Sequence, residues 1–156
     1  MMGLEIEKKF LLKNDSWKTQ ITTGNYYRQA YLSSQPDRVV RVRTVEDKAY
    51  LTIKGKSVGA VRSEYEYEIP YEEAVEILTR ICEKPIIEKI RYKVMYKNLL
   101  WEIDEFEAEN KGLVVAEVEL EEENQHIELP PWVGEEVTMQ EKYYNASLIK
   151  NPFSGW

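Results

Sequence analysis

The feature that most constrains the fold is an alternation of charged and apolar side chains that recurs along the chain. In extended backbone, successive side chains point to opposite faces, so Glu5, Glu7 and Lys9 share one face of the first segment and Ile6 and Phe10 share the other. Eight segments have strand character and are joined mostly by short turns: 3–12, 26–33, 38–45, 49–56, 61–69, 86–96, 99–108 and 113–120. They predict a mainly β (α+β) fold, built as an antiparallel barrel or a strongly curved sheet.

Helical signals are few. Residues 71–83 lie between two prolines and place apolar side chains at helical spacing, which predicts one α-helix after the fifth strand. Turn-forming residues predict a short helix over 16–21, and the end of the chain is expected to be loop with a short helix near 145–150. Because there is no repeat and no linker, residues 1–156 are expected to form a single domain.

Composition excludes several functional classes. A hydrophobic fraction of 43% and a charged fraction of 31% are typical of a soluble globular protein, and no apolar run is long enough to span a membrane. The formal net charge of −7 argues against binding to a nucleic-acid backbone. We expect a cytoplasmic protein and leave its oligomeric state open, a homodimer included. The single cysteine, Cys82, lies on an apolar helical stripe and is expected to be a buried core residue, not a nucleophile.

The charged face of the predicted strands can be arranged in two ways. Alternation alone favours a sheet that shows its charges to solvent and packs its apolar face on a core. Acids and bases are sorted by strand, however, which favours a curled sheet with an inward anion wall and cation wall. Such a hydrated tunnel would hold a polyphosphate through Lys and Arg directly and through Mg²⁺ or Mn²⁺ on the carboxylates. The charged face carries Glu5, Glu7, Lys9, Arg41, Arg43, Lys54, Glu64, Glu66, Lys89, Arg91, Asp104, Glu117 and Glu119.

The segment Glu5-Ile6-Glu7-Lys8-Lys9 resembles the ExExK signature of the CYTH superfamily, the triphosphate tunnel metalloenzymes. Companion motifs follow in order: Arg41-Val42-Arg43, Leu51-Thr52-Ile53-Lys54, Arg62-Ser63-Glu64-Tyr65-Glu66, Glu88-Lys89-Ile90-Arg91-Tyr92, Glu102-Ile103-Asp104, Glu117-Val118-Glu119 and the tail 132–138. The resemblance covers essentially the whole chain. It implies an eight-stranded antiparallel β-tunnel with a charged interior and a few helices packed outside, and so favours the inward arrangement.

The resemblance also implies roles for the charged residues. The expected metal ligands are Glu5, Glu7, Glu64, Glu66, Asp104, Glu117 and Glu119. The expected phosphate-binding residues are Lys9, Arg41, Arg43, Lys54, Lys89 and Arg91. Glu64 and Glu66 would orient the attacking water, and Lys9 or Lys89 would offset charge or donate a proton as pyrophosphate leaves; the choice between these lysines stays open.

The activity implied by the resemblance is metal-dependent hydrolysis of a triphosphate, with inorganic tripolyphosphate as the leading substrate and nucleoside triphosphates as slower ones. The alternatives are a class IV adenylate cyclase-like activity and a thiamine triphosphatase. Class IV cyclases usually carry a His-Phe stretch ahead of ExExK, where this sequence has Met1-Met2-Gly3-Leu4. A non-catalytic polyphosphate- or nucleotide-binding tunnel would need the cations but few of the acids, and a plain barrel or sandwich with a charged solvent face would need neither.

Overall fold

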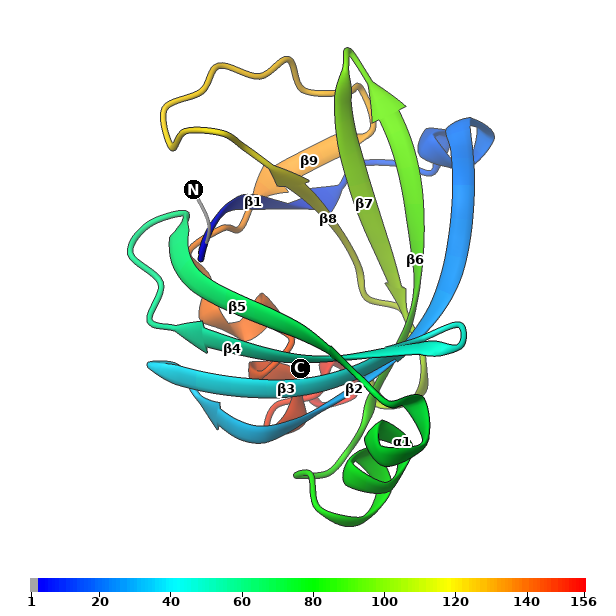
Figure 1. Ribbon diagram of the computed structural model, residues 1–156. Helices are drawn as coiled ribbons and strands as arrows, with labels where there is room; N and C mark the ends of the chain where they lie inside the picture. Colours follow the sequence, from blue (N-terminus) through cyan, green and yellow to red (C-terminus); the bar gives the residue numbers. More distant parts are fainter. Residues whose placement is uncertain (1–2) are drawn as a thin grey trace.

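The computed structural model describes residues 3–156, and Met1 and Met2 lie outside the described part of the chain (Figure 1). The strands are β1 (Leu4–Leu12), β2 (Ile21–Gln35), β3 (Arg38–Val45), β4 (Lys48–Gly55), β5 (Val61–Ile69), β6 (Ile87–Tyr96), β7 (Leu99–Phe106), β8 (Val114–Glu119) and β9 (Val133–Glu136). One α-helix, α1 (Tyr71–Arg80), follows β5 within residues 3–156. Short 3₁₀ turns are η1 (Ser16–Gln20), η2 (Ala108–Asn110), η3 (Glu141–Tyr143), η4 (Ser147–Ile149) and η5 (Phe153–Gly155). No helix in this part of the chain is long and apolar enough to cross a membrane.

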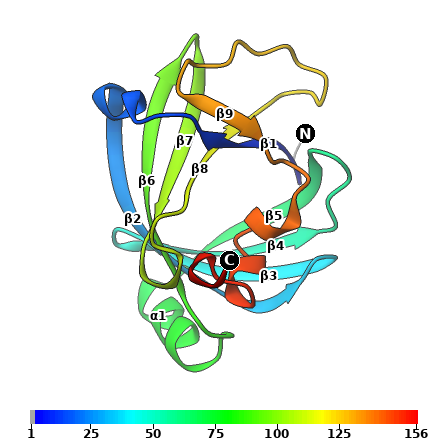
Figure 2. The ribbon, with the colours of Figure 1, turned by 180° about the vertical axis from the view of Figure 1, so that it is seen from behind.

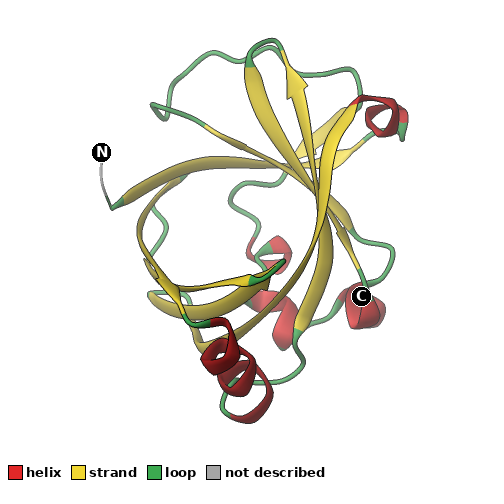
Figure 3. Ribbon diagram, turned by 45° about the vertical axis from the view of Figure 1, so that its right-hand side comes forward, coloured by secondary structure: helices red, strands yellow, loops and turns green. Residues whose placement is uncertain are grey.

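The sheet closes on itself because β1 changes partner along its length. The strand order is β5-β4-β3-β2-β6-β7-β8-β1-β9, and a further pairing joins β5 to β1. Residues 4–6 of β1 pair with β5, and residues 7–11 pair with β8. Figure 3 shows the strands curling into a ring. The predicted eight-stranded antiparallel barrel is therefore confirmed, with β9 as an additional strand beside β1.

Two elements differ from the sequence expectation. β9 was expected to be loop because four residues that include Gly134 carry almost no periodic signal. β2 begins at Ile21 instead of residue 26, because Gly24 continues the strand and does not end it. A Cβ at Gly24 would lie 2.9 Å from the ring of Tyr92, so this glycine permits a close approach between β2 and β6.

The outside of the barrel is covered by two apolar clusters. Ala74 and Leu78 of α1 pack on Ala30, Val42 and Ala49 of the strands beneath, in a cluster that also buries Cys82 as predicted (Figure 2). A second cluster, on another part of the barrel wall, contains Phe10, Trp17, Trp101 and Trp132. The outward apolar face predicted from the alternation is thus covered over these two areas, whereas Ile53, Tyr65 and Tyr67 on β4 and β5 are exposed.

A third apolar cluster closes one end of the bore. Val39 and Ile87 lie two residues before Arg41 and Lys89, so their side chains share the inward face with these cations. They pack with Tyr31, Phe106, Val115 and the C-terminal residues Tyr143, Leu148 and Ile149. The expectation of a charged interior therefore needs a correction: the bore is ionic over only part of its length, and the C-terminal segment fills the remainder.

Candidate active site

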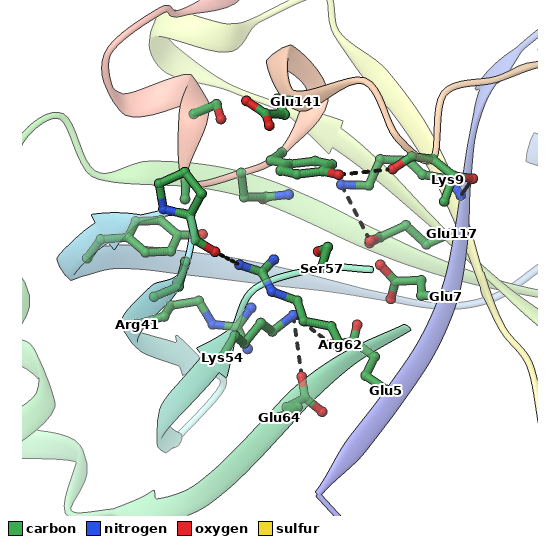
Figure 4. A pocket seen from close by; sticks show the side chains of 18 of the residues that line it. Glu5, Glu7, Lys9, Arg41, Lys54, Ser57, Arg62, Glu64, Glu117 and Glu141 are labelled. Atoms are coloured by element: carbon green, nitrogen blue, oxygen red, sulfur yellow. Dashed lines mark hydrogen bonds and ion pairs between the residues drawn. The ribbon is translucent and has the colours of Figure 1, made fainter. Parts of the chain in front are cut away.

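The ionic part of the bore encloses a cavity of about 280 Å³ (Figure 4). Apart from Asp104, every site residue expected from the sequence lines it. The charged lining residues are Glu5, Glu7, Lys9, Arg41, Arg43, Lys54, Arg62, Glu64, Glu66, Lys89, Arg91, Glu102, Glu117, Glu119 and Glu141. The fold thus brings together, at one place, side chains from strands that lie far apart in the sequence.

On one side of the cavity, Lys54 and two arginines are paired with glutamates. The register of β4 and β5 sets Lys54 opposite Glu64, and Lys54 Nζ lies 3.4 Å from Glu64 Oε2 and 2.9 Å from Glu5 Oε2. Figure 4 shows Glu5 and Glu64 on either side of this lysine. Arg41 and Arg43 each place a guanidinium nitrogen 3.5 Å from Glu66 Oε2.

On the other side, Asp104 lies beneath the cavity and holds two cations. Arg91 donates to Oδ1 and Oδ2 of Asp104 at 2.7 and 2.8 Å, and Lys89 Nζ donates to Oδ2 at 2.8 Å. Arg91 also donates to Glu117 at 2.6 Å, and Lys9 Nζ lies 3.8 Å from the second oxygen of Glu117. Asp104 is only 1% exposed, so its carboxylate orients Lys89 and Arg91 from the side that faces away from the cavity.

The two walls expected from the sequence are interleaved in the structure. Each of the predicted phosphate-binding cations lies within 4 Å of a carboxylate, because antiparallel pairing sets acidic strands beside basic ones. Buried ions are retained only where a partner compensates the loss of hydration. The carboxylates therefore keep the cations charged and oriented in the empty bore.

Glu5 and Glu7 share a face of β1, but their pKa values are shifted in opposite directions. Burial alone would raise the pKa of Glu5, but the charge of Lys54 and the hydrogen bonds from Lys54, Glu7 and Glu64 together outweigh burial and lower that pKa to about 2. Burial, with Glu117 and Glu5 nearby, raises the pKa of Glu7 well above its ordinary value. No Lys, Arg or His of residues 3–156 forms an ion pair with Glu7. Glu7 therefore lacks the positive charge that its neighbours have.

The acidic residues near Glu7 have the oxygen ligands that a divalent cation needs, but their side chains are not arranged around one common point. Within residues 3–156, no group of three or more acidic, cysteine or histidine side chains is arranged so that it could hold a metal ion. Glu7 nevertheless lies opposite Glu119 in the pairing of β1 with β8, and Glu117 is two residues before Glu119 on β8. Glu5 Oε2 is buried without a hydrogen bond of good geometry. These carboxylates lie close together and have few cationic partners. They are therefore suited to bind Mg²⁺ or Mn²⁺, which prefer oxygen ligands.

Some cavity residues were not among those expected. Arg62 has the same parity on β5 as Glu64 and Glu66, so a stricter use of the period of two would have included it. Its Nε donates to the carbonyl of Gly55 at 2.6 Å. Tyr144 and Asn145 reach the cavity from the C-terminal segment, where no periodic signal exists to predict an inward side chain.

A closed barrel whose bore holds paired cations and carboxylates defines a class of tunnel proteins suited to polyanions. The chain belongs to the CYTH domain family, whose profile matches residues 3–150. It is 52% identical over 155 residues to an inorganic triphosphatase of Acetivibrio thermocellus, a match that covers 99% of both chains. It is 33% identical over 152 residues to an inorganic triphosphatase of Nitrosomonas europaea, covering 92% of this chain and 95% of the relative.

A solved structure agrees with these matches. The crystal structure of the inorganic triphosphatase NE1496 superposes with a TM-score of 0.65 at 31% identity and covers 93% of each chain. The family resemblance predicted from the ExExK segment and its companions is confirmed.

The ion pair of Glu5 and Lys54 predicts a pH-dependent difference in stability. A carboxyl whose folded pKa lies near 2, below its ordinary value of 4.5, stabilises the fold above about pH 4.5 and stops doing so as the pH falls through 2. Lys54→Met should therefore lower the free energy of unfolding by about 3 kcal/mol at about pH 7, and the deficit should shrink toward zero near pH 2. Urea unfolding at several pH values measures it.

Lys48→Met, which removes an exposed lysine from the same strand, is the matched control. It should change stability by less than about 0.5 kcal/mol at every pH. A deficit for Lys54→Met that stays constant from neutral to acid pH would contradict the assignment.

Proposed function

We propose that this protein hydrolyses a triphosphate, with inorganic tripolyphosphate as substrate and pyrophosphate and orthophosphate as products, in the presence of Mg²⁺ or Mn²⁺. The observation that carries the proposal is the convergence of Lys9, Lys54, Lys89 and four arginines on one small cavity lined also by carboxylates. Its volume of about 280 Å³ is at the small end of ligand pockets, which suits a compact polyanion. The names of both relatives support the same activity.

The arginines would bind the phosphate groups. Arg41, Arg43 and Arg91 present planar forks of N–H donors, which match phosphate oxygens as well as they match the carboxylates they contact in the empty bore. Substrate oxygens would replace Glu66 and Glu117 as acceptors. Because the cations are already charged and inward, little reorganisation is needed when the substrate enters.

Carboxylates of the same cavity would hold the divalent cation. Glu5, Glu7, Glu117 and Glu119 are the residues whose chemistry fits it, as argued above. The cation supplies polarisation of phosphoryl oxygens and neutralisation of the charge that develops on them. Glu7 would bind it as a carboxylate and so must lose its proton first.

The attacking water and the leaving group need a base and an acid. Glu64 faces the cavity, and burial with Glu5 nearby raises its pKa, which suits a carboxylate that orients water and takes its proton. Burial and Arg91 lower the pKa of Lys89 to about 7 against the opposing effect of Asp104. Lys89 is therefore the better proton donor to the departing pyrophosphate, and Lys9 would neutralise charge. The bond from water oxygen to the terminal phosphorus forms as the bridging P–O bond breaks.

Turnover tests the proposal directly. The wild type should release orthophosphate from tripolyphosphate only with Mg²⁺ or Mn²⁺, and chelation should abolish the release. Arg43→Ala should lower kcat/KM by about 100-fold or more, since it removes a charge-assisted contact to the reacting phosphates. Arg38→Ala, which removes an exposed arginine from the same strand, is the control and should be neutral. ATP, GTP and thiamine triphosphate should be slower substrates.

Two kinds of result would contradict the proposal, and each points to a different function. Faster turnover of thiamine triphosphate, or cyclic AMP as a product of ATP, would transfer the chain to one of the alternative activities. Tripolyphosphate that raises the melting temperature without being hydrolysed would identify a binding protein.

Metal binding can be tested without turnover. Titration with Mn²⁺ alone, measured by calorimetry in two buffers of different ionisation enthalpy, should show binding accompanied by proton release, since the raised pKa of Glu7 favours its protonated form before the metal binds. Glu7→Gln should weaken binding by about 10-fold or more and suppress the proton release. Glu68→Gln, an exposed change on β5 outside the cavity, should leave both intact. Equal Mn²⁺ affinity in the Glu7→Gln variant would contradict the assigned ligand.

A further inference from the structure

Lys89, the lysine assigned as proton donor, is held by a side chain from the C-terminal segment. Lys89 is 1% exposed, and its ammonium group has three N–H donors. One bonds Asp104 Oδ2 at 2.8 Å, and another bonds Asn145 Oδ1 at 3.0 Å. Only the third remains for a ligand in the cavity. The direction of that N–H is therefore set by Asn145 as much as by Asp104.

The orientation of the Asn145 amide is itself fixed. Gln29 is fully buried on β2, and its Nε2 donates both to Asn145 Oδ1 at 3.1 Å and to the hydroxyl of Tyr31 at 2.9 Å. Since an ammonium group cannot accept a hydrogen bond, Asn145 must turn its oxygen toward Lys89, and Gln29 must then offer its NH₂ group. Gln29 Oε1 is left buried without a partner. The Gln29 amide is therefore held in this orientation by the two hydrogen bonds that its NH₂ group donates.

The same C-terminal segment contacts the second lysine of the site. Lys9 Nζ donates to the backbone carbonyl of Tyr143 at 3.3 Å and lies 5.5 Å from the centre of the Tyr144 ring. The segment is anchored in turn by Leu148, which is fully buried in the apolar end of the bore. Asn145 therefore sits on a rigid support, as a residue that sets the position of another requires.

We propose that Asn145, oriented by Gln29, is a positioning residue that holds the Lys89 ammonium group toward the cavity. The inference rests on the proposed function, in which Lys89 protonates the departing pyrophosphate. Asn145 acts through Lys89 and need not touch the substrate. Its loss should therefore reduce the rate of the chemical step and leave ground-state binding of the triphosphate nearly unchanged.

The kinetics of single and double variants test this. Asn145→Ala should lower kcat about 10-fold with KM for tripolyphosphate within about twofold, because part of the proton-donor contribution is lost. In a Lys89→Ala background the same substitution should have no further effect, as expected for two residues that act as one unit. Asn151→Ala, an exposed change on the same C-terminal segment, is the matched control and should be neutral. Gln29→Leu should act in the same direction and replaces Asn145→Ala if that variant does not fold.

A spectroscopic readout keeps the inference separate from the proposed function. In spectra of the protein with ¹³C-labelled lysine, the Cε resonance of Lys89 should move in Asn145→Ala and stay in place in Asn151→Ala. If the wild type does not hydrolyse tripolyphosphate, the proposed function fails and this resonance alone decides the positioning role. An unmoved Lys89 resonance, or an equal loss of kcat in the presence and absence of Lys89, would overturn the inference.

Discussion

The structure depends on ion pairs formed inside a barrel. Turning lysines and arginines inward removes them from bulk water, and the cost is met only where carboxylates stand within contact distance. Antiparallel register supplies these contacts, since Lys54 faces Glu64 across β4 and β5 and Arg91 faces Asp104 across β6 and β7. The apolar faces of the same strands are then free to pack against α1 and the surrounding loops. One alternating pattern thus produces both an apolar exterior, much of it covered, and an ionic bore.

These ion pairs also explain how one set of residues serves two states. Within the bore the carboxylates compensate the arginines, while Glu7, which forms no ion pair with a cation among residues 3–156, has a pKa well above its ordinary value. When a polyanion and a divalent cation bind, the partners would change. The arginines would bind phosphate oxygens, and the carboxylates would bind the metal. In both exchanges each buried charge receives a new partner of opposite sign.

Much of the fold could be predicted because period-two alternation is a local property. It identified the strands of the barrel and the inward parity of most cavity residues, and the ExExK segment identified the family. Parity does not specify register, so it could not show that Asp104 lies beneath Lys89 and Arg91, or that Glu66 is shared by Arg41 and Arg43. Asn145 and Tyr144 were unpredictable, because long-range packing of Leu148 places them in the bore and no local pattern marks them.

The central claim is that the ionic bore receives the triphosphate by exchanging carboxylates for phosphate oxygens. A crystal structure with tripolyphosphate and Mn²⁺, using the anomalous signal of the metal, measures this most directly. The account predicts phosphate oxygens within hydrogen-bond distance of Arg41, Arg43 and Arg91, with the Mn²⁺ peak on the Glu7 side of the bore. A triphosphate bound elsewhere on the barrel, with every ion pair of the bore intact, would contradict it.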